Sequence, residues 1–157
     1  MCIRDSTYYD GPITTHISSA DPYCPELRAL LFETCRQHDI DVRPAGTVVV
    51  IQGPRFSTRS ESKWFSSQGW EVINMTQYPE VVLARELEMC YVNISLVTDY
   101  DVGIEGQLDL PPVTAEEIIR ILNANNARLK DVIFDVVPRI PVDRTCPCAS
   151  ALASARL

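Results

Sequence analysis

The sequence lacks a long apolar run, a surplus of basic residues and a glycine-rich tract, and each absence excludes a class of protein. Its longest uninterrupted apolar runs have four residues, as in Val48 to Ile51, whereas a membrane-spanning helix needs about 20. The 14 Lys and Arg residues are outnumbered by 21 Asp and Glu residues, which gives a net charge of -7 and disfavours nucleic acid and membrane surfaces as partners. Only 6 of the 157 residues are glycine, so no flexible linker between domains is indicated.

The N-terminal residues show no basic patch followed by an apolar segment, so they do not resemble a secretory signal peptide. We therefore expect a cytoplasmic protein, and its 157 residues match the size of one ordinary domain. Six cysteines would suit a disulfide scaffold only in a small secreted chain. Cys146 and Cys148 form a lone Cys-x-Cys motif, which we expect to lie in an exposed tail and to bind no metal.

Helix and strand patterns alternate along the first half of the chain. Apolar residues recur at helical spacing over Pro25 to His38, and the β-branched stretch Thr47 to Gln52 is typical of a strand buried on both faces. Thr58 and Glu61 then form a capping box, which predicts a helix that ends near Gln68. His38 lies at the C-terminus of the first predicted helix. A favourable interaction with the helix dipole explains a histidine at this position better than a catalytic role does.

The same order continues in the second half. Trp70 to Met75 predicts a second buried strand, Pro79 to Glu88 a helix, and Cys90 to Thr98 a third strand. Thr114 caps a last long helix, which Pro138 ends. Strands that alternate with helices predict an α/β fold with a mixed, mainly parallel central sheet flanked by helices.

Three loops follow the predicted strands, at the edge where parallel sheets usually bind their ligands. These loops hold an aromatic ring, a thioether, a hydroxyl and two carboxylates, which suit a flat apolar ligand with polar edges. The residues are Phe56, Met75, Thr76, Asp99 and Asp101.

Asp99 and Asp101 are two residues apart, so in an extended segment both carboxylates point to the same side, about 7 Å apart. Desolvation and mutual repulsion would then let one of them keep a proton for a leaving group. A second interpretation is that both are ordinary turn residues. A cation site is a third, although the neighbouring sequence lacks the further oxygen ligands that Ca²⁺ or Mg²⁺ needs.

Four blocks, taken in order and spacing, resemble the 5'-methylthioadenosine phosphorylases of the purine nucleoside phosphorylase superfamily. The blocks are Gly46 to Ser57, Ser60 to Ser62, Val72 to Thr76 with Pro79 to Glu86, and Thr98 to Asp101. The resemblance extends from about Tyr8 to about Pro138 and corresponds to the C-terminal portion of the family's domain. It implies phosphorolysis of methylthioadenosine to adenine and 5-methylthioribose 1-phosphate, with inorganic phosphate as co-substrate and no cofactor.

The resemblance also implies a role for each loop residue. Asp99 would be the catalytic residue that protonates N7 of the purine, and Asp101 would bind the 6-amino edge. Phe56 would pack against the base, Met75 would lie against the ribose, and Thr76 would bind phosphate. The 6-oxopurine phosphorylases carry asparagine at the first of the two aspartate positions, so the aspartate favours adenine over hypoxanthine.

Three further roles rest on the resemblance alone. In a homotrimer, His16 would reach across an interface to the neighbour's methylthio pocket. Ile118 and Ile119 would line such a pocket, where an apolar wall favours a thiomethyl group. Without the resemblance, His16 reads as a surface residue and at least one of the two isoleucines as core.

The family's first strand, its phosphate-binding loop and a later Arg-His pair have no counterpart in the sequence. We therefore expect an incomplete domain without its N-terminal part, inactive and poorly stable by itself. We divide the chain into a non-native leader at residues 1–6, a partial phosphorylase domain at 7–145 and a tail at 146–157 that could be truncated. A 6-oxopurine or methylthioinosine phosphorylase and a non-catalytic nucleoside-binding subunit stay open as alternatives.

Overall fold

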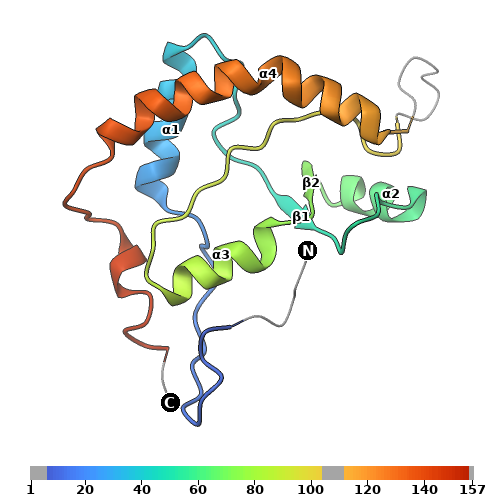
Figure 1. Cartoon of the computed structure of the whole chain (residues 1–157). Coiled ribbons are helices and arrows are strands. Elements are labelled where there is room, and N and C mark those ends of the chain that lie inside the picture. Colours follow the sequence, from blue (N-terminus) through green and yellow to red (C-terminus); the bar gives the residue numbers. More distant parts are fainter. Residues whose placement is uncertain (1–6, 104–111, 156–157) are drawn as a thin grey trace.

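Helices and short strands alternate in the computed structural model, which describes residues 7–103 and 112–155 (Figure 1). The leader predicted at residues 1–6 lies outside these ranges. The helices are α1 (Pro25–Gln37), α2 (Arg59–Ser67), α3 (Gln77–Glu86) and α4 (Ala115–Val136), the strands are β1 (Val48–Val50) and β2 (Val72–Asn74), and two short 3-10 helices are η1 (Val137–Arg139) and η2 (Pro147–Ser150). This order agrees with the predicted α/β class.

The long helix α4 packs across α1 (Figure 1). Leu31 and Cys35 of α1 form one buried cluster with Val132 and Val136 of α4, and Val132 has no exposed surface. These positions recur at the three- and four-residue spacing of a helix face, so the two apolar stripes face each other. This α1–α4 junction is the larger of the two buried clusters in the described residues.

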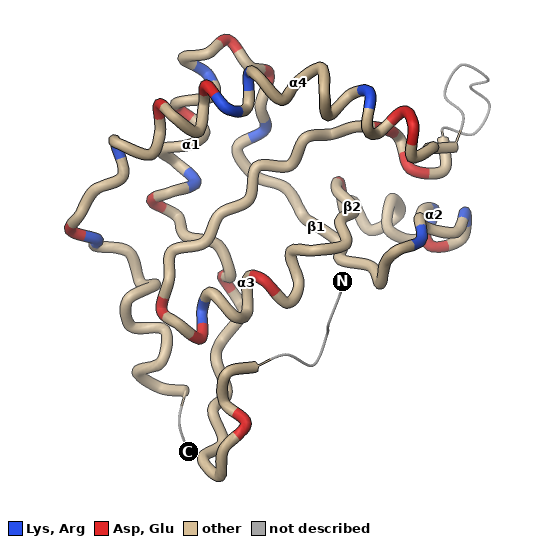
Figure 2. The backbone as a smooth tube through the Cα atoms, viewed as in Figure 1, with Lys and Arg blue, Asp and Glu red and all other residues tan. Residues whose placement is uncertain are grey.

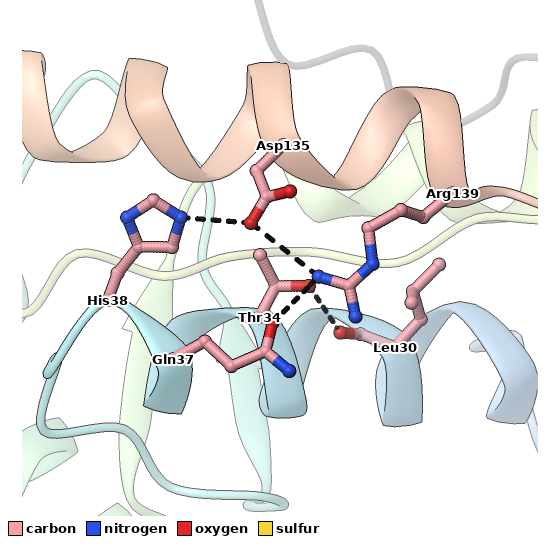
Figure 3. A network of polar contacts seen from close by, with 6 residues as sticks. All are labelled: Leu30, Thr34, Gln37, His38, Asp135 and Arg139. Carbon is pink, nitrogen blue, oxygen red and sulfur yellow. Dashed lines mark hydrogen bonds and ion pairs between the residues drawn. The ribbon is translucent and has the colours of Figure 1, made fainter.

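A polar network borders the α1–α4 junction (Figure 3). His38 Nε2 lies 3.1 Å from Asp135 Oδ2. Arg139 donates through Nη1 to Thr34 Oγ1 at 3.1 Å and to Gln37 Oε1 at 2.9 Å. The sequence interpretation of His38 through the helix dipole alone was therefore incomplete, because its ring also pairs with a carboxylate on α4.

The strands β1 and β2 are parallel, with Val48 opposite Val72 and Val50 opposite Asn74. They are shorter than the predicted stretches, and each of their residues is half-buried. The prediction of strands buried on both faces was therefore wrong. Among the described residues this sheet has two strands, and so small a sheet leaves part of each face uncovered.

The predicted third strand, Cys90 to Thr98, is not a strand in the structure. It is the yellow segment that leads from α3 toward the turn before α4 (Figure 1). A strand needs a neighbour that pairs with its backbone N–H and C=O groups, and this segment has no ladder with any described residue. Its backbone is instead held at Tyr91 O, which accepts a hydrogen bond from Cys24 N at 2.8 Å.

The expectation of an exposed tail was also wrong. Cys146 and Cys148 are 7% and 4% exposed, because the chain after η1 folds back onto the start of α1 and the end of α3. Arg144 Nη1 donates to Glu88 O at 2.7 Å, and the Thr145 hydroxyl donates to the Glu26 carboxylate. These contacts bring the Cys-x-Cys motif against residues far away in the sequence.

The surface charges are mixed in sign. Figure 2 shows Lys and Arg interleaved with Asp and Glu along α2 and α4. Within residues 7–103 and 112–155, no helix combines the length and apolar character that crossing a bilayer would require.

Candidate active site

The carboxyl ends of β1 and β2 lie side by side, because the strands are parallel and in register. The first strand leads into the loop with Phe56, and the second into Met75 and Thr76. We refer to residues 52–58, 75–78 and 99–103 as the loop edge. Five of the residues that the sequence predicted as site residues belong to it.

The first loop is held by an ion pair and a helix cap. Arg55 donates to both Glu61 carboxylate oxygens, at 2.8 and 2.7 Å, and the Glu61 carboxylate also accepts from Thr58 N at 2.8 Å. Thr58 Oγ1 accepts from Glu61 N in return, which completes the predicted capping box. The Arg55 guanidinium lowers the pKa of Glu61 to about 2. Phe56, 40% exposed, is presented by a loop fixed at both ends.

The second loop is organised by Asn74, a residue that the sequence analysis missed. Its Oδ1 accepts from Thr76 N at 2.6 Å and from Gln77 N at 2.8 Å. Thr76 is exposed just before α3, and Met75 is half-buried. The Thr76 hydroxyl donates to the same Oδ1 at 3.3 Å, and Tyr78 has non-helical dihedral angles, so the regular part of α3 begins after it. An asparagine two or three residues before a helix is the signal that identifies such a turn.

The third part of the loop edge is a turn at the two aspartates. Asp99 Oδ2 accepts from Thr98 Oγ1 at 2.5 Å, and Asp99 Oδ1 accepts from Asp101 N at 2.7 Å. Asp101 has a φ of 56°, in the left-handed region, so the segment is not extended there. The sequence argument that both carboxylates point to the same side of a strand therefore fails, and Asp99 does serve the turn.

The Asp101 carboxylate has one oxygen that takes no part in the turn. Its Oδ2 is buried and has no hydrogen-bond partner within the described residues. A buried acceptor without a donor is unfavourable by about 1–3 kcal/mol. A ligand that offers an N–H group at this position would remove that penalty.

Two hydrogen bonds connect this turn to its neighbours. Arg59 Nη1, at the start of α2, donates to Val102 O at 3.4 Å, and Val113 N donates to Asp101 O at 2.8 Å. The helix α4 begins at Ala115, two residues after Val113, so its start lies close to the loop edge.

The start of α4 carries the two predicted pocket isoleucines. Ile119 is 58% exposed and Ile118 is half-buried. The expectation that at least one of them is core was therefore wrong, because the buried side chains of α4 are Val132 and Val136, near its other end.

His16 is not brought to the loop edge of its own chain. It is exposed, and its N–H donates to Ala155 O at 2.7 Å. Its segment is anchored to α3 by the buried Glu86 carboxylate, which accepts from Thr7 Oγ1 and Tyr8 N, both at 2.7 Å. In Figure 1 this segment lies beside the C-terminal end, away from α2.

A cavity of about 510 Å³ lies between α1, α4 and the strand pair. Its lining is mainly apolar and includes Leu31, Val48, Val72 and Val132, but none of the predicted site residues. Bond cleavage in a polar ligand requires polar groups that converge. Those groups are found at the loop edge, and we therefore take the loop edge rather than this cavity as the candidate site.

Comparison with known proteins gives consistent matches. The sequence model of the phosphorylase superfamily matches residues 1–138. The chain is 48% identical over 152 residues to S-methyl-5'-thioadenosine phosphorylase from Thermofilum pendens, a match that covers 97% of this chain and 56% of that protein. It is 46% identical to purine nucleoside phosphorylase from Streptomyces coelicolor, over 95% of this chain and 56% of that protein. The chain therefore spans about half the length of these relatives.

A solved structure agrees with the sequence matches. Methylthioadenosine phosphorylase from Schistosoma mansoni in complex with adenine superimposes with a TM-score of 0.83 at 26% identity, over 96% of this chain and 59% of that chain. The fold that the resemblance implied is therefore confirmed for the part of the domain that the chain contains.

Proposed function

This chain belongs to the phosphorylase superfamily, and from that premise we propose that its activity is phosphorolysis of S-methyl-5'-thioadenosine to adenine and 5-methylthioribose 1-phosphate. The observation that carries the proposal is the aspartate turn, where one carboxylate is fixed by two hydrogen bonds and the next has a buried oxygen without a donor. The relative that is 48% identical bears this activity in its name.

The two aspartates have different tasks in this reaction. As the N-glycosidic bond breaks, a phosphate oxygen bonds to the anomeric carbon, and the departing purine gains negative charge. Asp99 transfers a proton to N7 as the bond breaks and so lets neutral adenine leave. Asp101 Oδ2 accepts a hydrogen bond from the 6-amino group, which supplies the missing donor.

The other residues of the loop edge bind the remaining parts of the substrates. The ring of Phe56 packs against the base, and Met75 lies against the ribose. Thr76 binds phosphate, for which its hydroxyl exchanges the long 3.3 Å bond to Asn74 Oδ1 for a bond to a phosphate oxygen. The reaction uses inorganic phosphate as co-substrate, needs no cofactor, and has the cytoplasm as its location.

The methylthio group takes its pocket from two chains. Ile118 and Ile119 supply an apolar wall beside the aspartate turn. His16, remote from the loop edge of its own chain, acts on a neighbour's site in a homotrimer. This arrangement accounts for a histidine and an isoleucine that are both exposed in the single chain.

A second candidate is a purine nucleoside phosphorylase that acts on 6-oxopurines, because a relative that is 46% identical carries the more general name. The two candidates are distinguished at Asp99, the position at which the resemblance gives the 6-oxopurine phosphorylases an asparagine. A carboxylate oxygen accepts from the amine of adenine, whereas it repels the carbonyl of hypoxanthine.

The test measures phosphate-dependent release of base from methylthioadenosine and from inosine by the protein that carries this sequence. We expect methylthioadenosine to be preferred. Asp99→Ala should lower the rate by about 10²–10⁴-fold, the usual contribution of a general acid, while Asp143→Ala, which alters an exposed aspartate between η1 and η2, should leave it unchanged. Preference for inosine would favour the second candidate, and an undiminished rate in Asp99→Ala would refute the role of Asp99.

A further inference from the structure

Four cysteine side chains meet at a place that the proposed reaction does not use. Cys24 precedes α1, Cys90 follows α3, and Cys146 and Cys148 flank Pro147 at η2. All four Sγ atoms lie within 4.8 Å of one another, and Cys90 Sγ is 3.4 Å from Cys146 Sγ. Cys24 has no exposed surface. The elements that carry this cysteine cluster lie on the side of the molecule away from α2 (Figure 1).

We propose that Cys24, Cys90, Cys146 and Cys148 form a structural tetrathiolate site for one Zn²⁺ ion. Zinc in structural sites is tetrahedral, with Zn–S distances of about 2.3 Å. The edge of that tetrahedron, the distance between two sulfurs, is therefore ~3.8 Å. The sulfur–sulfur separation is 3.4 Å for Cys90 and Cys146 and at most 4.8 Å for the other pairs. These distances match the tetrahedral edge after small side-chain rotations.

The contacts among the thiols favour one metal ion over two disulfides. Two disulfides would divide the four residues into two pairs, each with sulfurs about 2.05 Å apart. Here each of the four Sγ atoms lies within 4.8 Å of the other three, and the 3.4 Å contact joins Cys90 to Cys146, so the four sulfurs form one group. A centre shared by all four sulfurs explains this pattern, whereas a division into pairs does not.

The surroundings suit thiolates. Four thiolates and one Zn²⁺ carry a net charge of minus two, and the protons go to solvent when the metal binds. Arg144 Nη1 lies 3.9 Å from Cys90 Sγ, and its position is fixed by the bond to Glu88 O. Such outer groups orient metal ligands and offset their charge.

The site would have a structural task, since four protein ligands leave no open position for a substrate. The tail after η1 contains no α-helix or strand in residues 140–155. A metal bound to its two cysteines would join that tail to the start of α1 and to the end of α3. This inference does not depend on the proposed reaction.

The experiment titrates the metal-free, reduced protein that carries this sequence with Co²⁺ and then with Zn²⁺. We expect one Co²⁺ per chain, with the absorption of tetrahedral cobalt bound to thiolates, and its displacement by one Zn²⁺ together with a higher melting temperature. Fully reduced chain that binds no Co²⁺, or that binds it in octahedral geometry, would overturn the proposal. Both results are read on the unaltered chain and so do not depend on the folding of any variant.

Two variants then locate the site. Cys148→Ser should weaken Zn²⁺ binding by more than the 10–100-fold that substitutions outside the ligand set produce. Cys35→Ser, which alters a buried cysteine of the α1–α4 junction, should bind Zn²⁺ as the parent does. The assignment would be overturned if Cys148→Ser bound Zn²⁺ as tightly as the parent. It would also be overturned if intact-mass measurement showed disulfides that form in the presence of Zn²⁺.

Discussion

The α1–α4 junction and the loop edge are held by different kinds of interaction. In the junction, residues about 100 positions apart in the sequence bury one another, as Leu31 and Val132 do. At the loop edge, most bonds join residues two to six positions apart, as between Arg55 and Glu61 or between Asp99 and Asp101. Contacts between residues far apart in the sequence therefore stabilise the junction, whereas hydrogen bonds within short segments fix the shape of each loop at the loop edge.

This difference matters for function. Loops shaped by local hydrogen bonds can present exposed groups such as Phe56 and Thr76 without burying them. Their position relative to one another depends on the two short strands and on contacts such as the bond from Arg59 to Val102. Changes in the junction should therefore affect the whole fold, and changes at the loop edge should affect one loop at a time.

The largest effect is expected in the junction. Leu31→Ala should lower the free energy of unfolding by about 2–5 kcal/mol, because it removes a buried side chain and leaves a cavity. Phe134→Ala removes a larger side chain of α4 that is 76% exposed, and it should have a much smaller effect. Urea unfolding followed by circular dichroism measures both. Equal losses for the two variants would mean that the α1–α4 junction is not what holds the chain together.

A smaller effect is expected at the polar border of the junction (Figure 3). The buried Thr34 hydroxyl donates to Leu30 O and accepts from Arg139. Thr34→Val keeps the shape but removes both bonds, and it should lower the free energy of unfolding by about 1 kcal/mol. In an Arg139→Ala background, the loss in free energy of unfolding caused by Thr34→Val should be smaller by about 0.5 kcal/mol or more. Strict additivity would show that the two side chains do not interact.

The helices were predictable because their signals are local. The capping box of Thr58 and Glu61 and the Thr114 cap both occur where the sequence predicts them, and Pro25 begins α1 as expected. Each signal depends on residues within one turn of the helix end. Phe56, Met75 and Thr76 were also placed after the correct strands, whereas the two aspartates follow a segment that is not a strand.

Long-range features were not predictable in the same way. The stretch from Cys90 to Thr98 has the composition of a strand, but only a neighbouring strand can make it one. The cysteine cluster joins Cys90 to Cys146 across 56 positions, and no spacing rule connects them. The turn at Asp101 depends on a backbone conformation that alternation of side chains does not reveal.

The smallest effect is expected at the loop edge, where Glu61 should titrate near pH 2. The pKa of Glu61 falls from an ordinary 4.5 to about 2 in the folded chain, first because of the hydrogen bonds from Arg55 and then that from Thr58. A lowered pKa stabilises the folded loop above about pH 4.5, and that contribution disappears as the pH falls through 2. The amide resonance of Thr58, which donates to the Glu61 carboxylate, should therefore shift with a midpoint near pH 2. Arg55→Met should move this midpoint to higher pH while the α1–α4 junction stays intact. A midpoint near pH 4.5 in the unaltered chain would show that the first loop is not held by this ion pair.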